Sequence, residues 1–206
     1  MKITISGLSG CGSTTACNNV AKTLNLSVIN YTFRNLSADL KIPFEQLQND
    51  ASKNPDYDYF IDKNLITLAD KSNNCVIASR LAGWLFDDAN LRVWLSASIE
   101  TRAKRIASRE SKNISDVINE SLVRDEQNWN RYKKLYGVDV NDHEGFDIIV
   151  NTEYLTAQQV SALIVAAANL ASENNLYKPI KAATRIREIL EEKTKNSSFF
   201  KQFDSI

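Results

Sequence analysis

The sequence is poor in the residues that build metal clusters and disulfide frameworks. Its 206 residues include three cysteines, Cys11, Cys17 and Cys75, and a single histidine, His143. The cysteines are odd in number and widely separated, so they match neither a zinc-binding spacing nor a set of disulfide pairs. This usage is typical of a reducing compartment, and we expect a cytoplasmic protein. His143 lies in a polar stretch with no nucleophile beside it, so we assign it no catalytic role.

An excess of charge of one sign and long apolar runs are also missing. The chain carries 25 basic and 25 acidic residues, so its formal net charge is zero. A neutral chain lacks the basic excess that duplex nucleic acid attracts, and we expect no nucleic-acid partner. The apolar run at 160–171 is shorter than a bilayer-spanning helix requires, and no segment is typical of a signal peptide, so we expect no membrane partner. With 43% hydrophobic residues, the chain is expected to form one domain with an ordinary core.

Glycine is scarce, yet three of the six glycines fall within one short segment, at Gly7, Gly10 and Gly12. The segment follows a β-branched run at 3–5 and precedes serine and threonine residues that open a helical pattern. It matches the phosphate-binding pattern G-x-x-x-x-G-K-[ST] at Gly7, Gly12 and Thr14, whereas Ser13 stands in place of the lysine. Nucleotide phosphate binding is therefore predicted, without the cation that usually assists it.

A loop of this kind binds phosphate through its backbone. Glycine reaches positive φ at little cost, so successive N–H groups converge on one anion, and the following helix adds the positive end of its dipole. The Thr14 hydroxyl is the expected ligand of Mg²⁺. The alternative is an ordinary strand–turn–helix connection with turn and cap residues only. The residues expected to contact ATP are Gly7, Leu8, Ser9, Gly10, Cys11, Gly12, Ser13, Thr14 and Thr15.

Strand-like and helical patterns alternate along the chain, which is typical of βαβ units and a parallel sheet. Ligands of such sheets bind beyond the carboxyl ends of the strands, where residues 6–15, 79–80 and 96–102 are expected to meet. Strands are predicted at 2–6, 26–31, 75–78, 91–95 and 146–150, and helices over 14–24, much of 32–70, 99–136 and 156–174.

The last thirty residues read differently from the rest of the chain. One amphipathic helix is predicted at 184–193, followed by a polar stretch that ends in Phe199, Phe200 and Phe203. The three aromatic residues leave open whether this end docks on the body of the protein, contacts another subunit or is disordered.

Several stretches occur in an order that resembles a known family. They are residues 3–16, Ser-Arg-Leu-Ala-Gly-Trp at 79–84, Arg-Ala-Lys-Arg-Ile at 102–106, Arg-Tyr-Lys-Lys-Leu-Tyr-Gly-Val-Asp at 131–139 and Asp-Ile-Ile-Val-Asn-Thr at 147–152. Over about 1–170 they resemble the short, archaeal-type cytidylate kinases of the nucleoside monophosphate kinase group.

The resemblance implies an α/β fold of the P-loop kinase type, with three layers and a five-stranded parallel sheet in the order 2-3-1-4-5. It implies a domain at 1–175 that contains a monophosphate-binding region at about 32–70 and a lid at about 105–135. The remaining residues, 176–206, are expected to form a helical tail. Mobile parts of this kind close over their substrates and expel water.

The resemblance also implies a reaction. ATP would transfer a phosphoryl group to CMP or dCMP, giving ADP and CDP or dCDP, with Mg²⁺ required, and the protein would be a monomer or a weak dimer. Two alternatives remain open, namely a kinase for another small acceptor and a weak or silent nucleotide-binding protein. The silent alternative is motivated by Ser13 and by Ala78, which stands where related kinases end the third strand with a carboxylate.

Arginine suits the binding of two polyphosphates because its planar fork bonds phosphate oxygens in pairs. The resemblance assigns catalytic roles to Arg105, Arg124 and Arg131, ATP contacts to Arg105 and Arg109, and acceptor contacts to Arg34, Asp62, Arg80 and Gly83. The alternative is that these arginines are solvated, with Arg102, Arg105 and Arg109 forming an exposed stripe.

Asp58 and Asp62 lie four residues apart, so their carboxylates share one face of a predicted helix. A carboxylate accepts a hydrogen bond from the N4 amino group of cytosine, and the resemblance makes Asp62 the candidate for this contact. An exposed acidic helix face explains the same spacing.

Overall fold

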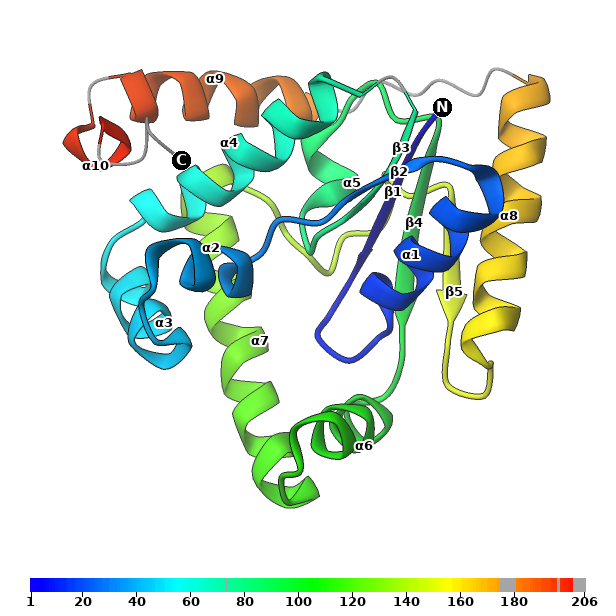
Figure 1. Cartoon of the computed structure of the whole chain (residues 1–206), viewed down its shortest axis with the longest axis horizontal. Coiled ribbons are helices and arrows are strands. Elements are labelled where there is room, and N and C mark those ends of the chain that lie inside the picture. The colour runs from blue at the N-terminus through cyan, green and yellow to red at the C-terminus, as the bar shows by residue number, and fades with distance from the viewer. Residues whose placement is uncertain (73, 175–180, 196, 202–206) are drawn as a thin grey trace.

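The computed structural model describes residues 1–72, 74–174, 181–195 and 197–201. Its centre is a five-stranded, fully parallel sheet in the order β2-β3-β1-β4-β5, which confirms the predicted order (Figure 1). The strands are β1 (Lys2–Gly7), β2 (Ser27–Ile29), β3 (Cys75–Ala78), β4 (Leu91–Ser96) and β5 (Ile148–Asn151).

Helices cover both faces of this sheet, so the fold has three layers (Figure 1). The helices are α1 (Ser13–Leu24), α2 (Phe33–Leu40), α3 (Phe44–Lys53), α4 (Asp56–Asp70), α5 (Ala82–Leu85), α6 (Ile99–Glu110), α7 (Ile114–Tyr136), α8 (Ala157–Asn174), α9 (Lys181–Lys195) and α10 (Ser198–Lys201).

The two-residue period of the strands divides the core between the two layers of helices. Val76 and Ala78 of β3 pack with α1 and α8 on one face, whereas Cys75 and Ile77 pack with α4, α5, α7 and α9 on the other. A central strand buried on both faces has no polar side to show, which explains why the sequence of β3 is a continuous apolar run.

Several predicted segments differ from the observed elements at their ends, and two of these differences have a clear local cause. The long helical stretch at 99–136 is divided into α6 and α7, because Ser111 ends α6 in the left-handed region at φ 53° and Asn113 caps α7. The last strand begins at Ile148 rather than at residue 146, since Phe146 lies in a turn in which its N–H donates to the carbonyl of His143 at 3.0 Å.

The helical hairpin of α6 and α7 projects from the sheet with a small apolar cluster of its own, Ala103, Ile106, Ala107 and Val117 (Figure 1). On the other side, α2, α3 and α4 share a second small cluster that contains Leu36, Leu47, Phe60 and Ile61. Each of these two outlying groups therefore has its own apolar contacts, separate from the two large clusters on the sheet.

The described part of the C-terminal end docks on the body of the protein. Ile186 and Leu190 of α9 belong to the large cluster on one sheet face, and the rings of Phe199 and Phe200 pack beside Tyr57 and Phe60 of α4. The third aromatic of this end, Phe203, lies outside the described residues. None of the helices in the described ranges is both long and apolar enough to cross a bilayer.

Gly83 of α5 is a position where a larger residue is expected to be costly. A Cβ there would lie 2.4 Å from two ring carbons of Phe146, a ring that packs against Trp84 and Trp94. We expect Gly83→Ala to destabilise the fold by about 1–3 kcal/mol through overpacking, measured by urea unfolding. The same change in a Phe146→Leu background should cost less, because the ring atoms concerned are gone. Equal costs in both backgrounds would contradict this account.

Candidate active site

The loop after β1 has the backbone conformation of an anion-binding turn. Gly10 and Gly12 lie at φ 89° and 97°, a region that glycine enters without the penalty of a Cβ. At Gly10 a Cβ would also lie 2.8 Å from the carbonyl oxygen and 2.9 Å from the Cα of Arg102. The loop ends where the N–H of Ala16 donates to the carbonyl of Gly12 at 2.9 Å, which starts α1.

The start of α1 faces open space. A Cβ built on Gly12 would meet no atom within 4 Å, and Thr14 and Thr15 are exposed. The first N–H groups of a helix have no partner within the helix, and they carry the positive end of its dipole. An anion in front of Gly12 would therefore meet backbone donors and a favourable field, whereas Ser13 supplies no charge.

Cys11 lies on the opposite, inner side of the loop. It is buried, its N–H donates to the carbonyl of Leu8 at 3.1 Å, and burial raises the pKa of its thiol. A raised thiol pKa disfavours the reactive thiolate. Cys11 therefore acts as a small packed residue of the loop.

Arg80, which follows β3, reaches this loop. Its Nη2 donates to the hydroxyl of Ser9 at 2.6 Å. Its charge also acts on two side chains from other elements. It offsets part of the rise that burial causes in the pKa of Asp58 on α4, and it adds to the lowering that burial causes in the pKa of Arg124 on α7. The residue after the buried strand thus lies among the loop, α4 and α7, as the position of Arg80 at a strand end suggested.

Arg102 is a residue of the site that we did not assign to it from the sequence. Only 5% of it is exposed, and its Nη1 donates to the carbonyl of Ser9 at 3.2 Å and to Asp125 of α7 at 2.8 Å. The exposed-stripe alternative is therefore wrong for Arg102. The available signal was its spacing, since Arg102 lies four residues before the buried Ile106 and shares its helix face.

Arg105 joins the loop to the end of β5. Its Nη1 donates to the carbonyl of Gly10 at 3.2 Å and to the hydroxyl of Thr152 at 3.0 Å, while its Nη2 donates to the Thr152 carbonyl at 2.6 Å. Thr152 is 2% exposed and also donates to the carbonyl of Cys11 at 3.2 Å. The contacts bring residue 105 to the loop; its catalytic and ATP-binding roles stay predictions.

Arg34 and Arg109 meet at one carboxylate. Both donate to Oε1 of Glu110, at 3.0 and 2.7 Å, and both side chains are 62% exposed. Burial opposes the ionisation of Glu110, but the hydrogen bond from Arg109 and the surrounding positive charges lower its pKa on balance. This exposed cluster connects α2 with the end of α6.

Arg124 and Arg131 lie two turns apart on α7. Burial, and after it the charge of Arg80, lower the pKa of Arg124. Arg131 places Nε 3.3 Å from Asp58 and donates through Nη2 to the amide oxygen of Asn128 at 2.8 Å. Arg124 and Arg131 thus lie on α7 beside charged groups of other elements, Arg80 and Asp58.

Asp58 and Asp62 are buried, with 3% and 6% exposed, so the exposed acidic face is wrong. Burial raises the pKa of Asp58 to about 6 and that of Asp62 to about 7. The hydroxyl of Tyr136 donates to Asp62 at 2.7 Å. We did not assign Tyr136 to the site from the sequence, although it belongs to one of the motifs noted there.

The departure at Ala78 leaves the site with few metal-binding groups of its own. Ala78 is 2% exposed and offers no carboxylate at the end of β3. Within the described ranges, no group of three His, Cys, Asp or Glu side chains has the arrangement of a metal site. Thr14 is exposed at the start of α1, where its hydroxyl could bind a cation that is carried by a polyphosphate.

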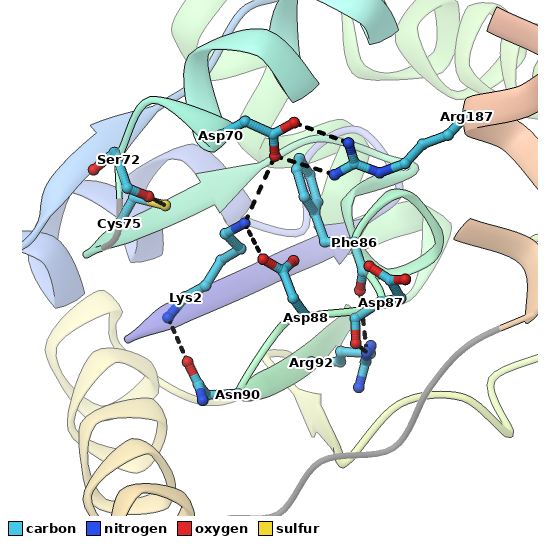
Figure 2. A network of polar contacts seen from close by, with 10 residues as sticks. All are labelled: Lys2, Asp70, Ser72, Cys75, Phe86, Asp87, Asp88, Asn90, Arg92 and Arg187. Carbon is cyan, nitrogen blue, oxygen red and sulfur yellow. Dashed lines mark hydrogen bonds and ion pairs between the residues drawn. The ribbon is translucent and has the colours of Figure 1, made fainter. Parts of the chain in front are cut away.

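The lysines Lys2, Lys22 and Lys104 do not supply the missing cation in the described part of the chain, since none of them has a hydrogen bond or ion pair with the loop. Lys2 lies at the other end of β1, where its Nζ contacts Asp88 at 2.5 Å (Figure 2). Lys22 belongs to the last turn of α1, and Lys104 is exposed on α6. The cationic groups with contacts to the loop are the guanidinium groups of Arg80, Arg102 and Arg105.

The sheet order and the glycine loop that leads into α1 are those of the P-loop kinase fold. A structure of deoxyadenosine kinase from M. mycoides with bound dATP has this fold, with a TM-score of 0.55 and 18% sequence identity, covering 82% of this chain and 100% of that one. At this identity the likeness concerns the fold alone.

The sequence comparisons identify the family. A model of the cytidylate kinase-like family matches residues 2–154. Cytidylate kinase 2 of Borreliella afzelii is 39% identical over 168 residues, which cover 80% of this chain and 94% of that protein. The cytidylate kinase of Thermococcus kodakarensis is 38% identical over 167 residues, covering 80% and 86%. The chain therefore belongs to the cytidylate kinase-like family, a family of phosphotransferases, which confirms the predicted resemblance.

The buried carboxylates make the stability of the fold depend on pH. The pKa of Asp62 is about 7 in the folded protein against an ordinary 3.8, so between these values the folded state binds a proton that the unfolded chain has released. Stability is therefore lost as pH rises through this window. We expect the free energy of unfolding of Asp62→Asn, relative to that of the parent, to be higher at pH 8 than at pH 4.5. One pKa unit corresponds to about 1.4 kcal/mol, so the difference should be at most a few kcal/mol.

Urea unfolding of both proteins at the two pH values measures this difference. The exposed Glu126 on α7 provides a control, because Glu126→Gln should shift stability little and equally at both pH values. A difference between Asp62→Asn and the parent that does not change with pH would contradict the assignment.

Proposed function

We propose that the protein transfers the γ-phosphoryl group of ATP to CMP or dCMP, giving ADP and CDP or dCDP. The observation that carries this proposal is the position of Arg80. Its guanidinium group bonds the phosphate-type loop at Ser9 and lies close enough to Arg124 to lower the pKa of that residue. Positive charge is thus concentrated beside the loop, as a reaction between two phosphorylated substrates requires.

The donor nucleotide would bind at the loop. Residues 7–15 would hold the phosphates of ATP through backbone N–H groups, while Arg105 and Arg109 would contact the nucleotide from α6. Carbonyl contacts of Arg102 and Arg105 with Ser9 and Gly10 support this arrangement, because they fix the loop from its outer side.

The exposed hydroxyl of Thr14 fits a role in holding Mg²⁺. Mg²⁺ prefers oxygen ligands and usually takes them from one or two protein groups, the phosphates and water, which agrees with a site that has a hydroxyl but no carboxylate at Ala78. When bound, the ion would neutralise charge on the phosphates.

The acceptor would bind between α4 and the residues after β3. Arg34 and Arg80 would clamp the monophosphate, Gly83 would lie near it, and Asp62 would accept from the N4 amino group of cytosine. The names of the relatives support a cytidine nucleotide. Asp58, with a pKa of about 6 and Arg131 beside it, would be ionised at neutral pH and could share this role.

In the reaction, a phosphate oxygen of the acceptor would attack the γ-phosphorus, and ADP would leave. Arg105, Arg124 and Arg131 would stabilise the charge on the transferred group, since catalysis of this kind rests on positioning and electrostatics. Residues 32–70 and 105–135 are the proposed monophosphate-binding region and lid, whose closure would exclude water.

A catalytically silent nucleotide-binding protein is the second candidate, favoured by Ser13 and the buried Ala78. A third is a kinase for another small acceptor. Two measurements distinguish the three candidates. The first is a coupled ADP-release assay with ATP, Mg²⁺ and each nucleoside monophosphate in turn, and the second is calorimetric titration of ATP and CMP. We expect ADP release that depends on CMP or dCMP. Tight binding of both nucleotides without release would favour the silent protein, and release with a different acceptor would favour the third candidate.

Removing the guanidinium group after β3 tests the proposed acceptor clamp. We expect Arg80→Ala to lower kcat/KM for CMP by about 10²–10³-fold, the cost of losing one charge-stabilising group. Because Arg80 is only partly buried, the melting temperature should change little. Lys104→Ala, which removes an exposed charge from α6, is the matched control and should retain activity. Activity of Arg80→Ala within a few-fold of the parent would remove Arg80 from the acceptor site.

A further inference from the structure

The C-terminal helices α9 and α10 lie beyond the part of the chain that the family shares. The family model ends at residue 154, whereas α9 is Lys181–Lys195 and α10 is Ser198–Lys201. The match with the Borreliella protein covers 94% of that relative but only 80% of this chain. Helices α9 and α10 therefore lie outside the residues that the family model matches, and the structure shows where they dock.

Helix α9 packs against α4, α5 and α7 (Figure 1). These are elements that carry or flank the proposed acceptor site, since Asp62 is on α4, Arg80 lies just before α5 and Tyr136 is on α7. Ile186 and Leu190 are 0% and 3% exposed, within the same apolar cluster as Tyr136. Helix α9 thus contacts the three elements that carry or flank the proposed acceptor site.

A polar network ties the end of α4 to α9 and to the sheet (Figure 2). Arg187 of α9 bonds both carboxylate oxygens of Asp70 at 2.9 and 3.1 Å, and Nζ of Lys2 on β1 lies 3.9 Å from Asp70. The hydrogen bond from Arg187 lowers the pKa of Asp70, so the carboxylate is ionised at neutral pH. The last residue of α4 is held from two sides.

A second set of contacts holds the beginning and middle of α4. Lys63 donates to the hydroxyl of the buried Thr194 at 2.7 Å, and Ser197 donates to Asp56 at 3.1 Å. The ring centroids of Phe199 and Tyr57 are 4.8 Å apart, those of Phe200 and Phe60 5.7 Å, and the ammonium of Lys63 lies 5.6 Å from the centre of the Phe200 ring.

We propose that α9 and α10 form a strap that holds α4 in the position in which it binds the acceptor, so that Phe199, Phe200 and Arg187 act as positioning residues. The inference rests on the proposed function, because it takes the Asp58–Asp62 face of α4 as the acceptor-binding face. Without the strap, the small cluster of α2, α3 and α4 would have to be ordered when the acceptor binds. With it, that ordering cost is met on folding, and affinity for the acceptor increases.

Removing the two rings at the end of the strap tests this proposal. We expect Phe199→Ala/Phe200→Ala to weaken CMP binding by about 3–10-fold, which is the effect of about one kcal/mol of lost preorganisation. The KM for CMP should rise accordingly, while the KM for ATP stays within about twofold because the loop is unaffected. Amide hydrogens of α4 should exchange faster in the absence of nucleotide.

Leu163→Ala, on the 49% exposed Leu163 of α8, provides the matched control and should change none of these quantities. Arg187→Ala loosens the other end of α4 and is expected to act in the same direction, which keeps the test valid if the double variant does not fold. Unchanged CMP affinity together with unchanged exchange in α4 overturns the strap.

A parent protein that neither binds nor phosphorylates CMP would instead overturn the proposed function. In that case only the amide exchange rates of α4 would test whether the strap holds this helix. Exchange rates in the variant equal to those of the parent would overturn the strap as well. An equal loss of affinity for ATP and CMP would also overturn it, because it would indicate general destabilisation rather than positioning.

Discussion

The site depends on hydrogen bonds from three arginine side chains to oxygen atoms of one loop. Arg80 bonds the hydroxyl of Ser9, Arg102 its carbonyl, and Arg105 the carbonyl of Gly10. In a trans peptide the C=O and N–H point in opposite directions. Because the arginines bond the carbonyl groups, the N–H groups of the same peptides point away from these arginines. Side chains from distant segments therefore set the conformation in which the backbone can bind an anion.

The same contacts connect the loop to the elements around it. Arg102 also bonds Asp125 on α7, and Arg105 also bonds Thr152 after β5. A displacement of α6 or α7 would alter the loop, and a ligand in the loop would in turn affect these helices. If the positions of α6 and α7 affect ligand binding at the loop, then ligand binding must affect the positions of these helices to the same extent, because coupling between two sites is reciprocal.

Charge is distributed unevenly across the site. Two carboxylates on α4 are buried with raised pKa values, beside Arg131 and Tyr136. Keeping such groups inside the protein costs stability, and it supplies buried acceptors for hydrogen bonds. The absence of a lysine at Ser13 fits this pattern, because the cations near the loop come from arginines on other segments.

Local sequence determined the elements of this protein and the loop that binds phosphate in the proposal. Apolar runs such as 75–78 and the positions of Gly10 and Gly12 depend on neighbouring residues and on backbone sterics, and they predicted the strands and the turn. The order of the strands in the sheet was predicted from the family resemblance. The sequence did not distinguish a buried Arg102 from an exposed one, nor a buried Asp58–Asp62 pair from a solvated face. Only the tertiary structure decided these points and the docking of α9 on α4, because burial and pairing depend on which distant segments pack together, and the pattern of a single helix carries no information about its partner.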